Sequence, residues 1–340
     1  MKHSVILSLT LLLTATANAA PLDAIRHCRD FIRKAQLDDG AFRVTIKDDA
    51  VRIWPYFGNV GACALLAAHK LEPQPDDLDR VRRWLDWYAA HMRNDGTILD
   101  FYGTTRSYAP SPKRDSIDVY PPTYLAALWR YHQTQAGGIP VDEMKRRAEL
   151  SLHAIELALD PSDNLTWSSV PHRYKYPMDN IDVCIGLVEG ARLFEALGAR
   201  EQAKRCREIV GRTSAAIAKF WRADKGYFAW TKGNSPKTRT FENPYPDGVV
   251  NIYLAAHIDP PQPRLWENLR SKFGAAPRIT PDLWLAAARR SGTPEQIKFY
   301  TEAAIQRASS DTLDLQIASR LLLALAGQTT EPTIIPLPLP

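Results

Sequence analysis

The chain has 340 residues, of which 45% are hydrophobic and 24% are charged. This composition is too apolar for a disordered protein, and beyond the first 20 residues no apolar run is long enough to cross a membrane. The formal net charge is only +5, and acidic residues alternate with basic ones along the predicted helices, as in residues 79–83. Nucleic acid is therefore not an expected partner.

The first 20 residues have the organisation of a secretory signal peptide. A positive start at Lys2 and His3 precedes an apolar stretch, residues 5–13, and a small-x-small cleavage site, residues 17–19. We expect cleavage after residue 19 or 20 and a periplasmic or secreted bacterial protein. The apolar stretch is too short for a stable span, so no membrane insertion is expected after cleavage.

Helical periodicity then recurs six times along the chain. Amphipathic helices are predicted at residues 22–36, 76–93, 141–159, 199–221, 263–272 and 294–308. More apolar helices are predicted between or after them, at residues 59–71, 117–135, 181–197, 248–258, 281–290 and 312–327. Short turns follow the apolar helices, whereas long loops precede most of them. Strand signals occur in these loops, at residues 41–46 and 226–230, and predict short hairpins at most.

Six helical hairpins with alternating exposed and buried members predict two concentric rings, with the long loops at one end. This arrangement resembles the six-hairpin glycosidase superfamily, whose members are all-α, (α/α)6 toroids. The resemblance covers residues 22–327 and implies one toroid domain over residues 21–327, with acidic catalytic residues at the loop-rich end. The Pro-rich tail, residues 328–340, cannot be helical and is expected to be extended or disordered.

A near-repeat provides the leading catalytic candidates. Residues 115–119 read Asp-Ser-Ile-Asp-Val and residues 179–183 read Asp-Asn-Ile-Asp-Val, each at the start of an apolar helix. Hydrolysis of a glycosidic bond needs one carboxylic acid to protonate the leaving oxygen and one carboxylate that acts as base or nucleophile. The candidates, with two further acids from the loop before the fourth apolar helix, are Asp115, Asp118, Asp179, Asp182, Glu242 and Asp247.

Acids at these positions also suit helix capping, which is the favoured interpretation for Asp115 and Asp179. Asp282 and Asp314 are interpreted as helix-start acids for the same reason. Because adjacent hairpins of a ring lie side by side, Asp118 and Asp182 are predicted to face one shared pocket, with Tyr108 and Tyr174 nearby.

Aromatic residues gather in the same loops. Sugar rings stack their apolar faces on aromatic rings, and arginine can bind a carboxylate with two hydrogen bonds. The predicted substrate-binding residues are Trp54, Tyr56, Tyr102, Tyr108, Trp167, His172, Arg173, Tyr174, Trp230 and Tyr245. An acidic polysaccharide is therefore one candidate substrate.

Four cysteines follow the signal peptide: Cys28, Cys63, Cys184 and Cys206. An oxidising compartment permits disulfides, and four cysteines allow three pairings. Cys28 and Cys63 fall on consecutive predicted helices, as do Cys184 and Cys206, so two bridges are one interpretation and four buried thiols are the other. Of the two bridges, Cys184–Cys206 is favoured because a short turn joins its helices. No zinc-type spacing and no twelve-residue calcium loop is found, so no metal site is predicted.

The sequence thus predicts an exported glycoside hydrolase that acts on a polysaccharide or oligosaccharide. One alternative is a polysaccharide lyase that acts on a uronate-containing glycan. Its candidate active-site residues are His172, Arg173, Tyr174 and Asn180. Another is a non-catalytic glycan-binding toroid. No nucleophile elbow, P-loop or dinucleotide fingerprint is found, so no cofactor is expected. The oligomeric state is left open.

Overall fold

A computed structural model describes residues 20–112, 118–169, 174–232, 240–274, 280–327 and 335–339. The predicted signal peptide, apart from its last residue, lies outside the described residues. So do Asp115, His172 and Arg173.

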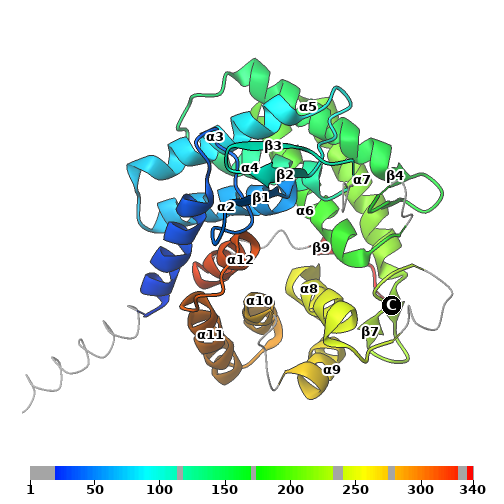
Figure 1. Ribbon diagram of the computed structural model, residues 1–340. Helices are drawn as coiled ribbons and strands as arrows, with labels where there is room; N and C mark the ends of the chain where they lie inside the picture. Colours follow the sequence, from blue (N-terminus) through cyan, green and yellow to red (C-terminus); the bar gives the residue numbers. More distant parts are fainter. Residues whose placement is uncertain are drawn as a thin grey trace, which may run out of the picture.

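Outer and inner helices alternate along the chain (Figure 1). The outer helices are residues 20–35, α3 (Pro75–His91), α5 (Val141–Ala158), α7 (Arg200–Ala218), α9 (Pro263–Phe273) and α11 (Pro294–Ala308). The inner helices are α2 (Pro55–Leu71), α4 (Tyr120–Gln133), α6 (Pro177–Ala196), α8 (Val249–His257), α10 (Pro281–Ser291) and α12 (Leu315–Leu325). A π-helical turn, η2 (Pro244–Gly248), leads into α8.

The inner helices close into a ring. Each packs against the next in the order α2, α4, α6, α8, α10, α12, and α12 packs against α2 again. In Figure 1, α9 and α11 lie outside α8, α10 and α12. The structure therefore confirms the predicted all-α, (α/α)6 toroid.

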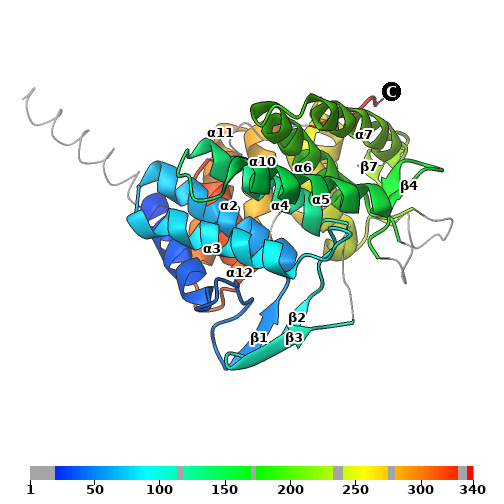
Figure 2. The same ribbon diagram turned by 90° about the horizontal axis from the view of Figure 1, so that it is seen from above.

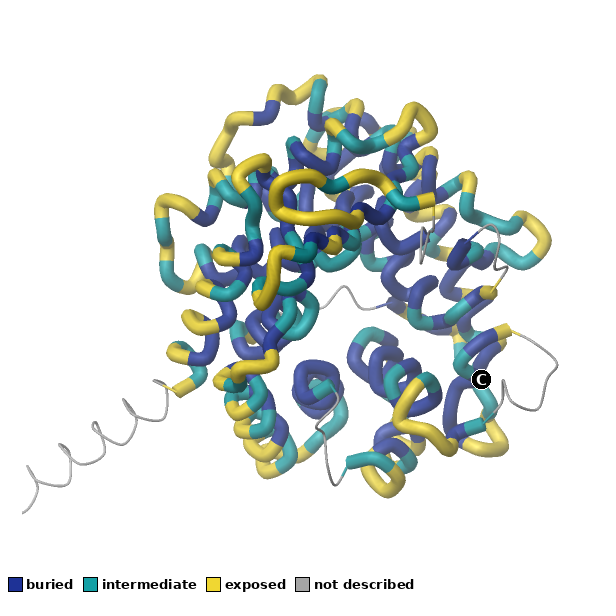
Figure 3. The backbone as a smooth tube through the Cα atoms, viewed as in Figure 1, coloured by how far each residue is buried: buried dark blue, intermediate teal, exposed yellow. Residues whose placement is uncertain are grey.

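The sequence pattern explains which helices lie inside. On α3, Val81, Trp84, Leu85 and Tyr88 share the buried face, and most of the charged residues lie off it. By contrast, α6 is buried on most sides, as its continuous apolar run predicts. Figure 3 shows the same difference, since the inner helices are mainly dark blue and the outer helices carry yellow stretches.

Proline sets several of the helix starts. Pro55 and Pro177 occupy the first turn of α2 and α6, so these helices begin at residues 55 and 177 rather than at the predicted residues 59 and 181. The helix α4 starts at Tyr120, after rather than within the first Asp-Ser-Ile-Asp-Val copy. The two copies of the near-repeat therefore do not occupy equivalent helical positions.

Most of the short strands lie where outer helices connect to inner ones. An antiparallel sheet has the order β1 (Ala50–Ile53), β2 (Phe101–Thr104), β3 (Ser107–Pro110). Two smaller hairpins pair β4 (Leu159–Asp160) with β5 (Leu165–Thr166), and β6 (Trp221–Arg222) with β7 (Tyr227–Phe228). Figure 2 shows the three-stranded sheet projecting from one end of the helices.

The strand predictions were only partly right. The segment 226–230 contains β7, as predicted. The segment 41–46 forms no strand, and Phe42 makes only an isolated bridge with Gln36. The β2–β3 hairpin was not anticipated; its strands are only four residues long and contain Gly103 and Pro110, which are both unfavourable in strands.

The described part of the C-terminal tail packs against the segment that follows α8. β9 (Ile335–Pro336) pairs in parallel with β8 (Ile258–Asp259), which directly follows α8. Ile335 and Leu337 are buried, and the Leu337 N–H donates to the Asp259 carbonyl. The described tail residues, 335–339, are therefore extended and packed, on the side of the ring opposite to the three-stranded sheet (Figure 2).

The predicted disulfide is wrong. Cys28, Cys63, Cys184 and Cys206 are all free and buried, which agrees with the alternative of four buried thiols. Cys184 and Cys206 lie on helices that pack together, but each behaves as a small apolar side chain in the core cluster. Among the described helices, none combines the length and apolarity needed to cross a bilayer.

Candidate active site

A cavity of about 170 Å³ lies within the inner ring, and all six inner helices contribute to its lining. Its polar lining residues are Tyr56, Asn59, Thr123, Arg130, Asp182, Tyr253, His257, Asp282 and Arg320. We call this space the central cavity.

Asp182, in the second turn of α6, is one of two carboxylates in the central cavity. The Tyr253 hydroxyl, from α8, donates a hydrogen bond to it. Burial raises the pKa of Asp182 to about 6, against the opposing effects of the Tyr253 hydrogen bond, the Arg320 charge and the Tyr56 hydroxyl. A carboxyl group with this pKa is substantially protonated in mildly acidic solution.

Asp282, at the start of α10, is the second carboxylate. Burial raises its pKa, and the positive charge of Arg320 on α12 acts in the opposite direction. The Oδ2 atom of Asp282 is buried and has no hydrogen-bond partner among the described residues. Arg320 itself donates to the Tyr56 hydroxyl over 3.2 Å. Two buried carboxylates therefore face one cavity, and they differ in hydrogen bonding: Asp182 accepts from Tyr253, whereas Asp282 keeps an oxygen without a partner.

His257 adds a neutral polar group to the same space. Burial lowers its pKa to about 4, assisted by the positive charges of Arg290, Arg320 and Arg130, so the imidazole is neutral at pH 7. Its ring lies 4.6 Å from the ring of Tyr253. Within the described part of the chain, the buried Nδ1 atom has no hydrogen-bond partner. Because buried polar atoms are usually hydrogen-bonded, this atom and Asp282 Oδ2 are available for a ligand.

Asp118 does not share this cavity, so the prediction of one pocket for Asp118 and Asp182 is wrong. Asp118 is 1% exposed and accepts a hydrogen bond of 2.8 Å from the Thr166 hydroxyl of β5. It lies in the turn before α4, where β5 covers it, and it is not among the described residues that line the central cavity. Asp179 is also buried, in the first turn of α6, where a carboxylate complements the helix dipole.

The acids before α8 have structural roles. Asp247 Oδ2 accepts hydrogen bonds from the Thr240 hydroxyl and from the backbone N–H groups of Glu242 and Asn243. These bonds fix the loop that precedes η2. Glu242 points outward and pairs with Lys272 over 2.6 Å. Neither acid lines the central cavity, so the structure removes both from the catalytic candidates.

The predicted aromatic residues divide into groups. Tyr56 lines the central cavity. Trp54 donates through Nε1 to the Tyr102 hydroxyl of β2 over 2.8 Å. Tyr108, on β3, donates to Asp39 and accepts from Trp87 over 2.9 Å. The expectation that Tyr108 lies beside Asp182 is therefore wrong, because its hydroxyl is bonded to Asp39 and Trp87 instead.

A second group forms a row beside the start of α6. The rings of Tyr174 and Tyr176 lie 6.0 Å apart, with 22° between their planes, and those of Tyr176 and Trp230 lie 6.1 Å apart, with 16° between their planes. Tyr174 is 52% exposed. Trp167 lies instead under Lys175, in a separate hollow, and Tyr245 is largely exposed on η2. We call Tyr174, Tyr176 and Trp230 the aromatic row.

Sequence reasoning missed much of the central cavity. Asp282 was interpreted as a helix-start acid, and Tyr253, His257 and Arg320 were not singled out. A signal was present, because Arg320 precedes a Leu-Leu-Leu run and His257 ends an apolar helix. Polar residues inside helices that are apolar on most sides must face either a partner or a cavity.

Comparisons with known proteins agree with the fold. No protein-family model and no curated protein matches the chain. Among solved structures, a beta-1,3-1,4-glucanase from Paenibacillus sp. X4 aligns with a TM-score of 0.63 and 10% identity over 90% of this chain and 91% of its own. A novel alpha-amylase from Clostridium perfringens aligns with a TM-score of 0.61 and 9% identity over 90% of this chain and 98% of its own.

An alpha-1,6-mannanase from Salegentibacter sp. HEL1_6 is also similar. Its inactive variant, in complex with alpha-1,6-mannotriose, aligns with a TM-score of 0.56 and 10% identity over 90% of this chain and 98% of its own. The chain therefore shares the (α/α)6 toroid fold with these enzymes. Identities this low extend the likeness to the fold alone, and the chemistry must be argued from the site.

Proposed function

We propose that the protein is an exported glycoside hydrolase that uses Asp182 and Asp282 as its catalytic carboxylates. The observation that carries this proposal is that both acids, from α6 and α10, line one cavity within the inner ring. Paired carboxylates are what glycosidic hydrolysis requires. A mannanase, a glucanase and an amylase have the same fold, and this likeness supports the proposal of a hydrolase for glycosidic bonds.

Asp182 is assigned the role of general acid. Its pKa is raised to about 6 mainly by burial, so a useful fraction is protonated near neutral pH. The protonated carboxyl group would give its proton to the glycosidic oxygen as the bond to the anomeric carbon breaks. Tyr253 holds the side chain through its hydrogen bond and so fixes the position of that proton.

Asp282 is assigned the role of base or nucleophile because it has an oxygen without a hydrogen-bond partner, whereas the Tyr253 hydroxyl binds Asp182. Its unpartnered Oδ2 atom can accept a proton from a water molecule or attack the anomeric carbon. The neutral His257 and the Tyr56 hydroxyl can then hydrogen-bond the sugar hydroxyls.

A polysaccharide or oligosaccharide is the proposed substrate. The central cavity lies within the ring of inner helices, so a polysaccharide that enters it must continue outside it. The aromatic row begins where α6 begins, one turn and a half before Asp182, and offers ring faces to further sugar units. This arrangement supports a substrate that enters the central cavity from the loop-rich end.

Hydrolysis is favoured over lyase chemistry by the state of the tyrosines. A lyase needs a tyrosine or histidine that removes a proton beside a carboxyl group. Burial raises the pKa of both Tyr56 and Tyr253, and burial lowers the pKa of His257 to about 4, which makes its neutral ring a weak base. Asn180, one of the predicted lyase residues, is fully buried and is bonded to Thr166 and Tyr176. Its side-chain oxygen accepts from Thr166 and its amide donates to the Tyr176 carbonyl, so these bonds tie β5 to the start of α6.

The test is a screen of the purified mature protein against neutral and acidic oligosaccharides, read for new reducing ends and for unsaturated products. We expect reducing ends, and their loss in both Asp182→Asn and Asp282→Asn. Asp142→Asn, which alters an exposed acid on α5, is the matched control and should keep full activity. Unsaturated products would overturn the hydrolase in favour of the lyase. Glycan binding with no cleavage of any kind would favour the non-catalytic toroid.

Export rests on the signal-like first 20 residues. Expression of the full chain in a bacterial host, followed by fractionation and mass measurement, tests it. We expect the mature protein outside the cytoplasm, with an N-terminus at residue 20 or 21. Uncleaved protein confined to the cytoplasm would contradict this part of the proposal and would leave the catalytic assignment untouched.

A further inference from the structure

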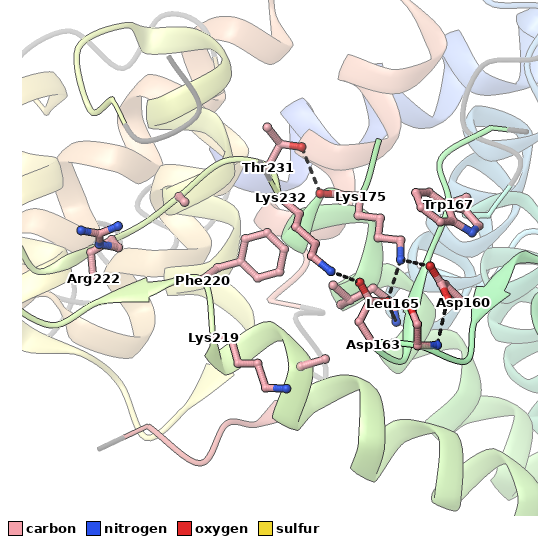
Figure 4. A pocket seen from close by; sticks show the side chains of 13 residues that line it. Asp160, Asp163, Leu165, Trp167, Lys175, Lys219, Phe220, Arg222, Thr231 and Lys232 are labelled. Atoms are coloured by element: carbon pink, nitrogen blue, oxygen red, sulfur yellow. Dashed lines mark hydrogen bonds and ion pairs between the residues drawn. The ribbon is translucent and has the colours of Figure 1, made fainter. Parts of the chain in front are cut away.

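A second hollow, of about 700 Å³, lies between the β4–β5 hairpin, the β6–β7 hairpin and the end of α7 (Figure 4). None of its lining residues lines the central cavity. Residues of α7, an outer helix, contribute to it, so it lies on the outer side of the rim. We call it the outer hollow.

The wall of the outer hollow is held in place by a buried lysine. Lys175 is 2% exposed, and its ammonium donates to Asp160 over 2.6 Å and to Asp163 over 2.7 Å (Figure 4). The same ammonium lies 3.7 Å from the ring centroid of Trp167. On the other side, the Lys232 N–H and the Thr231 hydroxyl both donate to the Lys175 carbonyl. These contacts make the wall rigid before any ligand arrives.

The same wall separates the outer hollow from the aromatic row. Lys175 and Thr231 line the hollow, while their chain neighbours Tyr176 and Trp230 stack on each other. Neighbouring residues of an extended chain point to opposite sides, and Tyr176 has extended backbone angles. The outer hollow is therefore distinct from the route that leads to the central cavity.

The charge of the outer hollow is positive. Four cations, Lys175, Lys219, Arg222 and Lys232, line it against two carboxylates, Asp160 and Asp163. Both carboxylates already pair with lysine. Lys175 pairs with Asp160 and Asp163, and Lys232 also pairs with Asp163. Lys219 is exposed and has no ion pair within the described residues, and Arg222 lies 3.8 Å from an exposed Asp224. Ion pairs this exposed are weak, so positive charge remains for a ligand.

The lining also includes apolar surface, from Leu165, Ala216, Phe220 and Ala229. A ligand that fits must therefore combine an anionic group with an apolar face, and its size must suit several hundred Å³. A sugar ring that carries a carboxylate or a sulfate has this chemistry, whereas a neutral sugar leaves the cations unused.

We propose that the outer hollow is a second, non-catalytic binding site for an anionic sugar unit of a glycan, with Lys219 and Lys232 as its accessible cations. The site goes beyond the proposed hydrolase reaction, because it shares no residue with the central cavity. It would hold an acidic polymer on the rim and so raise the local concentration of substrate.

The test is calorimetric titration of the Asp182→Asn protein, in which cleavage is disabled, with a galacturonate trisaccharide and with the matching galactose trisaccharide. At low salt we expect the acidic trisaccharide to bind at least tenfold more tightly, and this preference to fall as salt is added. Lys219→Ser combined with Lys232→Ser should remove the preference. Lys219→Ser alone should weaken it several-fold, and this variant leaves the Lys232–Asp163 pair intact.

The matched control is Lys225→Ser, which removes an exposed lysine from the β6–β7 turn that does not line the hollow. It should bind like the parent protein. Equal affinity for the two trisaccharides, or a preference that survives the double substitution, would overturn the site. Sodium sulfate or acetate that binds as tightly as the trisaccharide would show a site for free anions and overturn the glycan assignment. Because binding is measured without turnover, a protein that cleaves nothing can still confirm the site.

Discussion

Two nearly identical pentapeptides, residues 115–119 and 179–183, end in different environments. The last Asp of the first, Asp118, is buried beside β5 and accepts a hydrogen bond from the Thr166 hydroxyl. The last Asp of the second, Asp182, faces the central cavity and is held by the Tyr253 hydroxyl. Each carboxylate accepts a hydroxyl hydrogen bond, but of the two only Asp182 lines the central cavity.

The difference comes from where each helix begins. Pro177 starts α6 before the second pentapeptide, so Asp182 sits in the second turn of a helix and points into the ring. Tyr120 starts α4 after the first pentapeptide, so Asp118 stays in the preceding turn. Local sequence likeness therefore does not imply equivalent function when the helix register differs.

The largest expected contrast is in activity. Asp182→Asn should lower kcat by roughly 10²- to 10⁴-fold, because general acid catalysis contributes about that much. Asp118→Asn should leave kcat within a few-fold of the parent value and lower the free energy of unfolding by about 1 kcal/mol, since it weakens a buried hydrogen bond. Steady-state kinetics and denaturant unfolding measure the two effects. Equal loss of kcat in both variants would contradict the claim that Asp182, and not Asp118, takes part in catalysis.

Asp182→Asn should also stabilise the protein near pH 7. A carboxyl group whose folded-state pKa is raised from about 4 to about 6 costs stability as pH rises through that range, by on the order of 1–3 kcal/mol when fully ionised. Removing the ionisable group removes that cost. Unfolding measured at pH 4 and pH 7 should show a gain for the variant at pH 7 that is absent at pH 4.

The next effect concerns the packing of the two helices. A Cβ atom at Gly186 on α6 would overlap the backbone of Pro122 on α4, which has no room to move. Gly186→Ala should therefore lower the free energy of unfolding by about 1–3 kcal/mol through overpacking. Gly211→Ala on α7, where a Cβ would meet nothing within 4 Å, is the control and should raise stability by up to about 1 kcal/mol. Thermal unfolding of the pair checks the contact, and a stable Gly186→Ala protein would contradict it.

A smaller contrast follows from the two hydroxyl donors. The Tyr253 hydrogen bond lowers the pKa of Asp182, so Tyr253→Phe should raise that pKa further. The acid form would then persist to higher pH, and the falling limb of the activity profile should move upward from near pH 6. Thr166→Val removes the donor to Asp118 and should change stability without moving the limb. A downward shift in the Tyr253→Phe profile would refute the role of Asp182 as the acid.

The smallest effect is a thiol count. Cys184 directly follows the second pentapeptide and is buried, and burial raises the pKa of its thiol. Denatured, unreduced protein should titrate four thiols per chain, while the native protein reacts slowly because buried thiols with raised pKa are poor nucleophiles. Two titratable thiols would instead restore the predicted disulfide.

The sequence determined the helices, their order and their division into inner and outer sets. Helical periodicity separated α3, with its one apolar face, from α6, which is apolar on most sides, and proline marked several starts. These features depend on neighbours within a few residues, and a single chain contains that information. The toroid follows from them because six apolar helices must bury their surfaces against one another.

Only the tertiary structure decided which acids meet. Asp182 was predicted as a site residue, but its partner Asp282 stands 100 positions later, and Arg320 and Tyr253 come from two further helices. Ring closure brings these residues together across the chain, and the burial of Asp118 likewise depends on β5, whose Thr166 lies 48 positions further along. Such geometry depends on packing between distant helices, which no local pattern in the sequence records.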